Sequence, residues 1–311
     1  MRIVFMGTPE FAACILREVA RLEHEIVGVY TQPDKPQGRK AILTPPPVKQ
    51  LAMELGLPVY QPRRVKTSAA VEQLRDLRPD LILVAAYGQI LSQAILDIPA
   101  FGCVCIHASL LPKYRGAAPI QWAIANGEAV TGVTAMQMDA GIDTGDMILK
   151  QEVPIGEEET AGTLYDALAA AGAKVTGEIL AILSRGECLP REPQREEDAT
   201  YAPILTKEDG RIDWTMSARQ IVDRIRAFTP WPSCYTYLRG QKLAIGKASL
   251  VDPEKQGEPG RVLKSPKKMF WVQTGKGVIA VEELQLQGKK MMPASAFLLG
   301  NKVEGEILQG E

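Results

Sequence analysis

The sequence predicts an α/β protein with an open, doubly wound sheet in its N-terminal part and a smaller β domain in its C-terminal part. Apolar strands alternate with amphipathic helices from residue 2 to residue 183. After residue 206 the pattern changes to short β runs between glycine and proline turns, which indicates a small barrel or sandwich. Residues 189–203, rich in Pro, Glu and Arg, indicate a linker between the two parts.

The chain begins with a strand, a loop, a helix and a second strand. Residues 2–6 are apolar and predict the first strand, which Gly7 ends. Residues 11–22 have helical spacing, with Pro9 near the helix start, and residues 25–31 predict the second strand. The G-x-G-x-x-G fingerprint of dinucleotide sites is absent, so Gly7 is expected to form a tight turn rather than a phosphate cradle.

The remaining elements continue this alternation. Residues 80–86 form a continuous apolar run, typical of a strand buried on both faces. The other strands of the N-terminal part are expected at 58–60, 101–106, 132–138 and 147–153, and its helices at 48–55, 68–77, 119–125 and 160–183. The C-terminal β runs are expected at 235–238, 243–245, 260–263, 269–273 and 278–284, with one helix at 217–227.

Composition limits the class of protein. A length of 311 residues predicts two domains of about 150 residues. No apolar run approaches the ~20 residues that cross a bilayer, and the N-terminus is too short for a signal peptide, so we expect no membrane partner. Five cysteines, an odd number, indicate reduced thiols and a cytoplasmic protein. Residues 201–311 carry a net charge of +5 and residues 1–200 one of −6, which a polyanion partner or chance would explain equally well.

His107 and Asp143 are the first candidates for chemistry. His107 is one of only two histidines, and each of the two candidates follows an apolar strand. In an open α/β sheet these positions lie at the carboxyl edge, where ligands bind. A carboxylate beside a histidine fixes its tautomer and favours the imidazolium, which can then donate and act as an acid. The alternative is a histidine at the edge of the core and a turn aspartate that do not touch.

Cys103, Cys105 and His107 would share one face of a strand. Three readings of this pattern stay open. A zinc site would need a fourth ligand, and no other Cys or His lies near in sequence. A nucleophilic Cys105 activated by His107 would need an oxyanion loop, and none is evident. Small buried thiols are the third reading and the one we expect.

The loop from Gln32 to Lys49 is long and basic, with Arg39 and Lys40 after Gly38. Loops longer than about 12–15 residues in compact domains are often functional. The loop is therefore either a flexible basic finger for phosphate or nucleic acid, or an ordinary solvated loop.

Six motifs stand out in the chain: Phe5–Ala12, Thr31–Arg39, His107–Pro112, Arg115–Ile120, Met136–Asp146 and Phe228–Pro232. Together they resemble the methionyl-tRNA formyltransferase family over essentially the whole chain. The run from Ser109 to Pro112 alone would indicate only the broader folate-dependent formyltransferase group.

The resemblance implies three parts and two substrates. Residues 1–188 would form a Rossmann-like domain that binds 10-formyltetrahydrofolate, and residues 189–205 would be a linker. Residues 206–311 would form a barrel similar to an OB fold that helps to hold the initiator tRNA. The implied reaction transfers the formyl group to the amino group of methionyl initiator tRNA and leaves tetrahydrofolate. The protein would be a cytoplasmic monomer, and the reaction would need no metal.

The resemblance also assigns residues. The folate site would be lined by Ser109, Leu110, Leu111 and Pro112. Arg39, with Lys40 beside it, would lie in the loop that reaches the acceptor stem. His107 would donate a hydrogen bond to the tetrahedral oxyanion, and Asp143 would orient His107 and help to move protons off the amine through water.

Cys105 departs from the family pattern, which is Asn-x-His with the asparagine amide as an oxyanion donor. A thiol is a weak donor. Loss of one such donor costs on the order of 10²–10³ in turnover, or about 2.7–4 kcal/mol. Cys105 leaves a second function open, a folate- or tRNA-binding protein with weakened catalysis. A separate alternative is a folate-dependent enzyme that acts on a small amine such as a sugar nucleotide, and the basic C-terminal part and the Arg39 loop count against it.

Overall fold

A computed structural model describes residues 1–38, 41–265 and 269–309, which form two compact units. The N-terminal unit comprises Met1–Gly116, Val130–Pro154 and Tyr165–Tyr201. The C-terminal unit comprises Ala117–Ala129, Ile155–Leu164 and Ala202–Glu311. The predicted fold class, an open α/β sheet with a C-terminal β domain, is confirmed.

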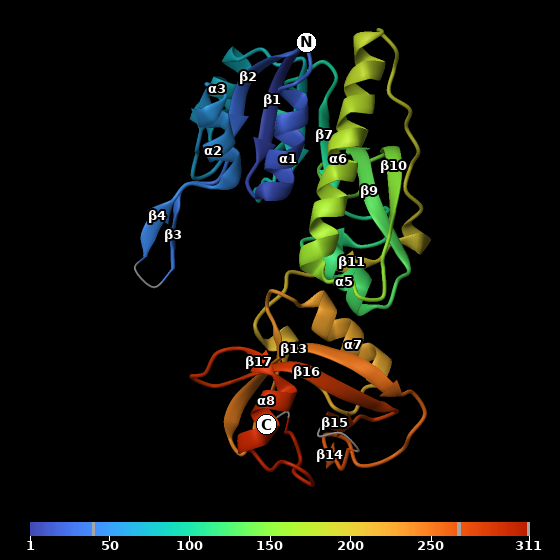
Figure 1. Ribbon diagram of the computed structural model, residues 1–311. Helices are drawn as coiled ribbons and strands as arrows, with labels where there is room; N and C mark the ends of the chain where they lie inside the picture. The colour runs from blue at the N-terminus through green and yellow to red at the C-terminus, as the bar shows by residue number, and fades with distance from the viewer. Residues whose placement is uncertain (39–40, 266–268, 310–311) are drawn as a thin grey trace. The chain divides into compact units, whose positions relative to one another are not determined.

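The N-terminal unit is built on a seven-stranded sheet with the order β10-β9-β7-β6-β1-β2-β5 (Figure 1). Five neighbouring strands are parallel: β1 (Arg2–Gly7), β2 (Glu25–Tyr30), β5 (Val59–Tyr60), β6 (Leu81–Ala85) and β7 (Cys103–His107). Two further strands, β9 (Val130–Gln137) and β10 (Met147–Pro154), extend the sheet in antiparallel pairings. The chain proceeds to opposite sides of β1, so the carboxyl ends of β1 and β6 form the switch point at which such sheets bind ligands.

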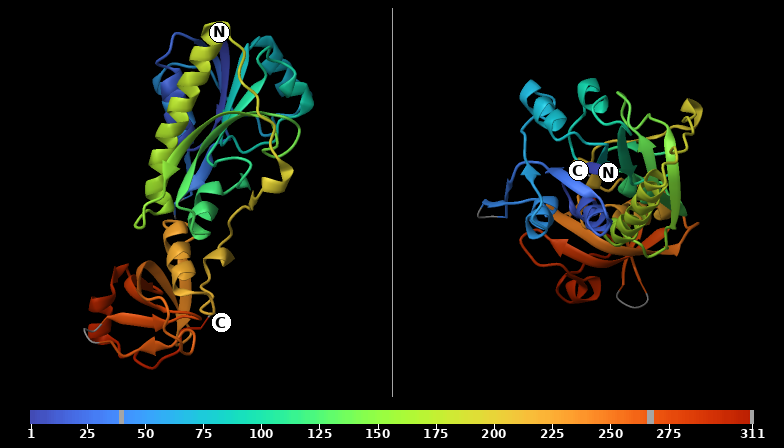
Figure 2. Two further views of the ribbon diagram at one scale, coloured as in Figure 1. Left: turned by 90° about the vertical axis from the view of Figure 1, so that its right-hand side faces the viewer. Right: turned by 90° about the horizontal axis from the view of Figure 1, so that it is seen from above.

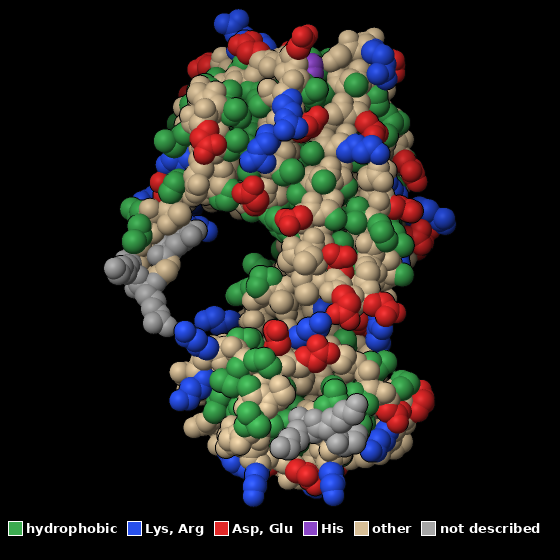
Figure 3. Space-filling view, in the orientation of Figure 1, with side chains coloured by type: hydrophobic (Ala, Val, Ile, Leu, Met, Phe, Trp, Pro, Cys, Tyr) green, Lys and Arg blue, Asp and Glu red, His purple; other side chains and the backbone are tan. Residues whose placement is uncertain are grey.

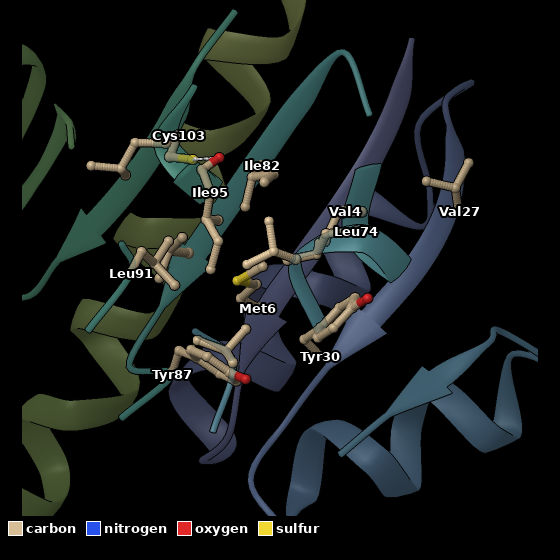
Figure 4. Packing of buried hydrophobic residues seen from close by; sticks show 14 residues of the cluster. Val4, Met6, Val27, Tyr30, Leu74, Ile82, Tyr87, Leu91, Ile95 and Cys103 are labelled. Carbon is tan, nitrogen blue, oxygen red and sulfur yellow. Dashed lines mark hydrogen bonds between the residues drawn. The ribbon is translucent and has the colours of Figure 1, made fainter. Parts of the chain in front are cut away.

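Helices cover both faces of this sheet (Figure 2). On one face, α1 (Glu10–Val19) and α6 (Ala161–Ser184) pack together, since Gly172 of α6 lies beside Ile15 and Ile106. On the other face, α3 (Ser68–Asp76) and α4 (Gln93–Leu96) cover the apolar cluster shown in Figure 4. Val4 and Met6 point into this cluster because alternate residues of a strand face opposite sides. The helix α2 (Pro47–Glu54) packs against α1, β2 and β5.

Gly7 makes the close approach that we expect of a turn residue. A Cβ at this position would collide with the Cβ of Ala12 and approach the carbonyl oxygen of Ala85 to 2.9 Å. The glycine therefore allows α1 to begin directly against the end of β6. The tight turn predicted from the sequence is thus part of the packing of β1, β6 and α1.

The segment expected to be a loop at 32–47 contains two short strands. β3 (Lys35–Gln37) pairs antiparallel with β4 (Ile42–Thr44). Arg39 and Lys40 lie outside the described residues. The sequence does not predict this pairing, because the segment is rich in prolines and charges. The hairpin buries little apolar surface, so the sequence shows no hydrophobic period there.

The helix α6 differs from the expectation that no segment approaches the length needed to cross a bilayer. Among the described residues it is the one helix long and apolar enough to do so by length and composition. Half of its most apolar stretch is buried inside the protein. Its apolar character thus serves in part to pack α6 on the sheet.

The C-terminal unit contains a curled antiparallel sheet that forms a half-barrel. Its strands follow the order β12 (Cys234–Leu238), β13 (Gln241–Asp252), β16 (Val278–Leu286), β15 (Phe270–Gln273) and β14 (Val262–Leu263), with β17 (Met292–Pro293) paired to β16. The register between β13 and β16 shifts at three places, and such irregularities bend strands. The unit also contains α5 (Pro119–Ala125), α7 (Ala218–Ala227), which packs on α5 and β13, and α8 (Ala294–Gly300). The sequence predicts α7 but not α8, which is only seven residues long.

Candidate active site

His107 and Asp143 lie together at the carboxyl edge of the N-terminal sheet. His107 is the last residue of β7, and Asp143 belongs to the connection between β9 and β10. Nδ1 of His107 is 3.6 Å from Oδ2 of Asp143, and the two side chains are 7% and 17% exposed. The structure thus brings together two residues whose separation in the sequence says nothing about their proximity.

The other nitrogen of His107 defines its tautomer. Nε2 lies 2.9 Å from the backbone carbonyl oxygen of Tyr114. Because a carbonyl oxygen only accepts, Nε2 carries a proton and donates it. Nδ1 is the nitrogen that faces the carboxylate of Asp143. When both nitrogens are protonated, His107 lies between an acceptor and a negative charge.

Asp143 is held in an unusual backbone conformation, with a φ of +54°. The amide of Gly116 donates a hydrogen bond of 2.8 Å to its Oδ2. Within the same loop, Asp139 accepts from the amide of Gly141 and the hydroxyl of Thr144. These bonds point the Asp143 carboxylate back toward β7.

Residues 191–194 lie along this loop, although the sequence indicates a linker there. Glu192 and Met147 exchange backbone hydrogen bonds of 2.9 and 2.8 Å. Gln194 donates to the carbonyl oxygens of Asp143 and Gly145, both at 2.8 Å. Nothing in the local sequence signals this role for Gln194, because the segment has no apolar period and its partners are about 50 residues away.

Cys105 faces the same side of β7 as Cys103 and His107, as the strand period predicts. It lies opposite Met136 in the sheet and packs against Leu111. Burial raises the pKa of the Cys105 thiol far above its ordinary range, and the nearby Asp143 carboxylate adds to this rise. The thiolate that a nucleophile needs is thus disfavoured.

In the part of the chain that it describes, the structure shows no ligand set for the zinc site considered at Cys103, Cys105 and His107. Burial raises the pKa of the Cys103 thiol to about 12, and its Sγ points toward the carbonyl oxygen of Ile95. Within residues 1–38, 41–265 and 269–309, no three His, Cys, Asp or Glu side chains are grouped so as to hold a metal ion.

The four residues predicted to line the folate site differ in burial and in their contacts. The Ser109 hydroxyl donates to the carbonyl oxygen of Lys113 at 2.6 Å, and Leu111 is 1% exposed in a cluster with Met136 and Met147. These two side chains therefore hold the loop in place. Leu110 and Pro112 are half-buried. A contact between any of the four residues, Ser109, Leu110, Leu111 and Pro112, and folate stays a prediction.

Two further polar groups lie at the same sheet edge, and neither belongs to a residue predicted for the site. Thr31 follows β2 and Tyr87 follows β6, and their side chains are 0% and 2% exposed. Neither hydroxyl has a hydrogen-bond partner among the described residues. Burial raises the pKa of Tyr87 to about 12, so its hydroxyl stays protonated and can donate. Buried polar groups without partners are rare in proteins and are candidates for contact with a ligand.

The chain matches two family models. Residues 1–180 match the model described as formyl transferase, and residues 204–302 match the formyl transferase C-terminal domain.

Full-length relatives agree with these matches. The chain is 48% identical over 311 residues to methionyl-tRNA formyltransferase from Geobacter sulfurreducens, covering 100% of this chain and 97% of the relative. It is 47% identical over 311 residues to methionyl-tRNA formyltransferase from Alkaliphilus oremlandii, with 100% of both chains covered.

Among solved structures, the chain is similar to WlaRD, a sugar 3N-formyl transferase crystallised in the presence of dTDP and 5-N-formyl-THF. The TM-score is 0.67, with 19% identity, and the match covers 93% of this chain and 99% of WlaRD. At this identity the likeness supports the fold only.

Proposed function

This chain belongs to the formyl transferase family, and we propose that it transfers the formyl group of 10-formyltetrahydrofolate to the amino group of methionyl initiator tRNA. The products are N-formylmethionyl-tRNA and tetrahydrofolate. The observation that carries the proposal is the identity of 48% with a methionyl-tRNA formyltransferase over both units of the chain. The protein is thus a formyl-transferring enzyme, and tRNA and folate are its substrates.

The geometry of His107 and Asp143 supports a simple mechanism. The amine attacks the formyl carbon, a C–N bond forms, and negative charge develops on the formyl oxygen. Protonated His107 stabilises this charge through Nδ1–H, because Nε2 is already bonded to the carbonyl oxygen of Tyr114. Asp143 stabilises the imidazolium and accepts, through water, the proton that the amine loses. The bond from the formyl carbon to N10 of the folate then breaks, and N10 takes up a proton.

The polar groups at the sheet edge support folate as the formyl donor. A pterin ring presents hydrogen-bond donors and acceptors around an apolar, planar core. The unpaired hydroxyls of Thr31 and Tyr87 lie below the surface of this edge, beside the apolar residues that surround Tyr87, so a polar ligand atom has to enter the edge to reach them. Leu110 and Pro112 offer partly exposed apolar surface at the neighbouring strand.

We propose that the C-terminal unit and the β3–β4 hairpin bind the tRNA. Residues 201–311 carry a net charge of +5, and Figure 3 shows Lys and Arg side chains, with Asp and Glu among them, on the C-terminal unit. Phosphate contacts need Lys and Arg side chains. Arg39 and Lys40, which come between β3 and β4 in the sequence, would contact the acceptor stem. The division into residues 1–188, 189–205 and 206–311 describes the proposed folate-binding, linking and tRNA-binding segments.

Cys105 is the observation that favours a second function, a binding protein with weakened catalysis. Its thiol lies among apolar side chains where the family has an amide donor. We propose that His107 alone supplies the side-chain donor for the oxyanion, so turnover is lower than in relatives with asparagine.

The deciding experiment is a formylation assay with purified protein, methionyl initiator tRNA and 10-formyltetrahydrofolate. We expect formylmethionyl-tRNA to form and the affinity for tRNA to fall steeply with salt. Formylation of a small amine such as an amino sugar nucleotide, but not of the tRNA, would contradict the proposal. Binding of both substrates without transfer would favour the second function.

We also propose that the enzyme acts as a monomer in the cytoplasm, without a membrane partner. Light scattering after gel filtration tests the monomer: we expect the mass of one 33.9 kDa chain. Fractionation of cells tests the location.

A further inference from the structure

We propose that Gln194 is a positioning residue for the reaction, which holds Asp143 in the conformation that His107 needs. The catalytic part of this proposal rests on the proposed formyl transfer, whereas the structural part, the support of the Asp143 loop, does not. Gln194 comes from a segment that carries no site motif, and its side chain reaches the backbone of the Asp143 loop.

The hydrogen bonds of the Gln194 amide use its whole capacity as a donor. Nε2 has two hydrogens, and it donates to the carbonyl oxygens of Asp143 and Gly145, both at 2.8 Å. Oε1 accepts from Nε of Arg115 at 3.0 Å. One side chain thus joins two carbonyls of the carboxylate-bearing loop to a buried cation.

Arg115 decides which way this amide points. Its side chain is 1% exposed, and its Nη1 donates to Glu196 at 2.8 Å. An arginine can only donate, so the oxygen of the Gln194 amide faces Arg115 and the nitrogen faces the loop. With the nitrogen turned away, the loop carbonyls would have no donor from this side chain.

The Asp143 loop needs such a support because its backbone is strained. Asp143 has a φ of +54°, which non-glycine residues adopt rarely and only when the surroundings favour it. The same residue must direct Oδ2 to the amide of Gly116 and toward Nδ1 of His107. Gln194 fixes the carbonyl on one side of the residue, while Gly116 fixes the carboxylate on the other.

The closing experiment compares Gln194→Glu with a matched exchange, Gln151→Glu. Glu at 194 keeps an acceptor for Arg115 but loses both donors and places negative charge against two carbonyl oxygens. Gln151 lies in β10 at the surface and accepts a hydrogen bond from Lys174. The control therefore makes the same chemical change beside a cation, away from the Asp143 loop.

We expect Gln194→Glu to lower kcat by about 10- to 100-fold, because small displacements of reacting groups have effects of this size. KM for tRNA and for folate should stay within about twofold, since Gln194 touches neither substrate in the proposed site. Gln151→Glu should leave both constants unchanged. A kcat equal to that of the parent, or a loss that appears only in KM, would overturn the catalytic part.

A second readout does not depend on formyl transfer. The chain has only two histidines, so its histidine side-chain NMR signals are readily assigned with His24→Gln. His24 precedes β2, at the sheet edge opposite to that of His107, and serves as an internal reference. We expect Gln194→Glu to shift the His107 signals in the direction seen in Asp143→Asn, with the His24 signals unmoved.

Unchanged His107 signals in Gln194→Glu would overturn the positioning role. Signals of both histidines that move together with a lowered melting temperature would also overturn it, because they would show a general loosening of the fold. If the parent protein does not formylate methionyl-tRNA, the proposed function fails, and the NMR comparison still decides the role of Gln194.

Discussion

Nδ1 of His107 lies 3.6 Å from the Asp143 carboxylate, while Nε2 of the same ring is 2.9 Å from the carbonyl oxygen of Tyr114. The distance to Asp143 is longer than a hydrogen bond. The carboxylate therefore attracts a proton on Nδ1 electrostatically but does not accept a hydrogen bond from it. This arrangement leaves Nδ1–H available to a substrate oxygen. The proposed role of His107 therefore depends on Nδ1.

His107→Ala should abolish formyl transfer and leave folate binding largely intact. The imidazole is proposed to act on the developing charge, which exists only after both substrates are bound. Turnover and folate affinity, measured on the same preparation, check this. Activity equal to that of the parent would remove His107 from the mechanism, and a parallel loss of folate binding would make it a binding residue.

Cys105→Asn should raise kcat, by at most the order of 10²–10³ that one oxyanion donor contributes. The same change should lower stability by about 1–3 kcal/mol if the amide finds no partner beside Leu111 and Met136. Turnover and a urea melt check the two effects. Cys105→Ala is the control and should leave kcat near that of the parent. A parent enzyme with ordinary turnover, and no gain from asparagine, would show that the thiol position does not limit the reaction.

Alkylation of the folded protein at pH 8 should modify Cys188 first. Cys188 is exposed, whereas burial raises the pKa of the thiols of Cys105, Cys103 and Cys234. The thiolate fraction of such a group is small at pH 8 and rises about tenfold per pH unit. Iodoacetamide labelling followed by mass spectrometry checks the order, and Cys188→Ser should remove the fast phase. Fast labelling of Cys105 would instead support a nucleophilic thiol.

The base of the β3–β4 hairpin should lose stability in acid. Hydrogen bonds from Gln61 and then Lys49 lower the pKa of Asp34 below its ordinary value. A folded-state pKa below the unfolded one means that the contribution is fully present above the unfolded pKa of about 3.9 and is lost as the pH falls through the folded pKa. Urea unfolding of the parent and Asp34→Asn, from pH 7 downward, should show a difference that shrinks only in that acid range.

Lys49→Met tests the same contact of Asp34 by removing its cationic partner. We call the contact of Asp34 with Lys49 and Gln61 the anchor of the hairpin. The Lys49 ammonium lies 2.8 Å from Asp34, and the Lys49→Met variant should lose the Asp34 contribution at a higher pH than the parent does. A difference between parent and Asp34→Asn that is independent of pH would assign the anchor to packing rather than to charge.

Much of the N-terminal fold could be predicted because its signals are local. The strand, helix and strand from Arg2 to Tyr30 each have their own hydrophobic period, and α6 lies within about two residues of its expected bounds. In the C-terminal unit the same holds for α7. The hairpin of β3 and β4 and the short helix α8 were missed because short or polar elements have almost no period. The family motifs added the kind of reaction, and one departure from them, Cys105, is visible in the sequence alone.

The sequence by itself determined the order of the sheet's first elements, the place of His107 at a strand end and the unusual residue at 105. Only the tertiary structure decided that Asp143 reaches His107, that Nε2 is bonded to Tyr114, and that Gln194 and Arg115 support the Asp143 loop. The physical reason is the range of the interactions. Hydrophobic periods depend on neighbours within a few residues. Apart from the hydrogen bond to Tyr114, the contacts named here join side chains to partners that only the packing of the sheet brings within reach.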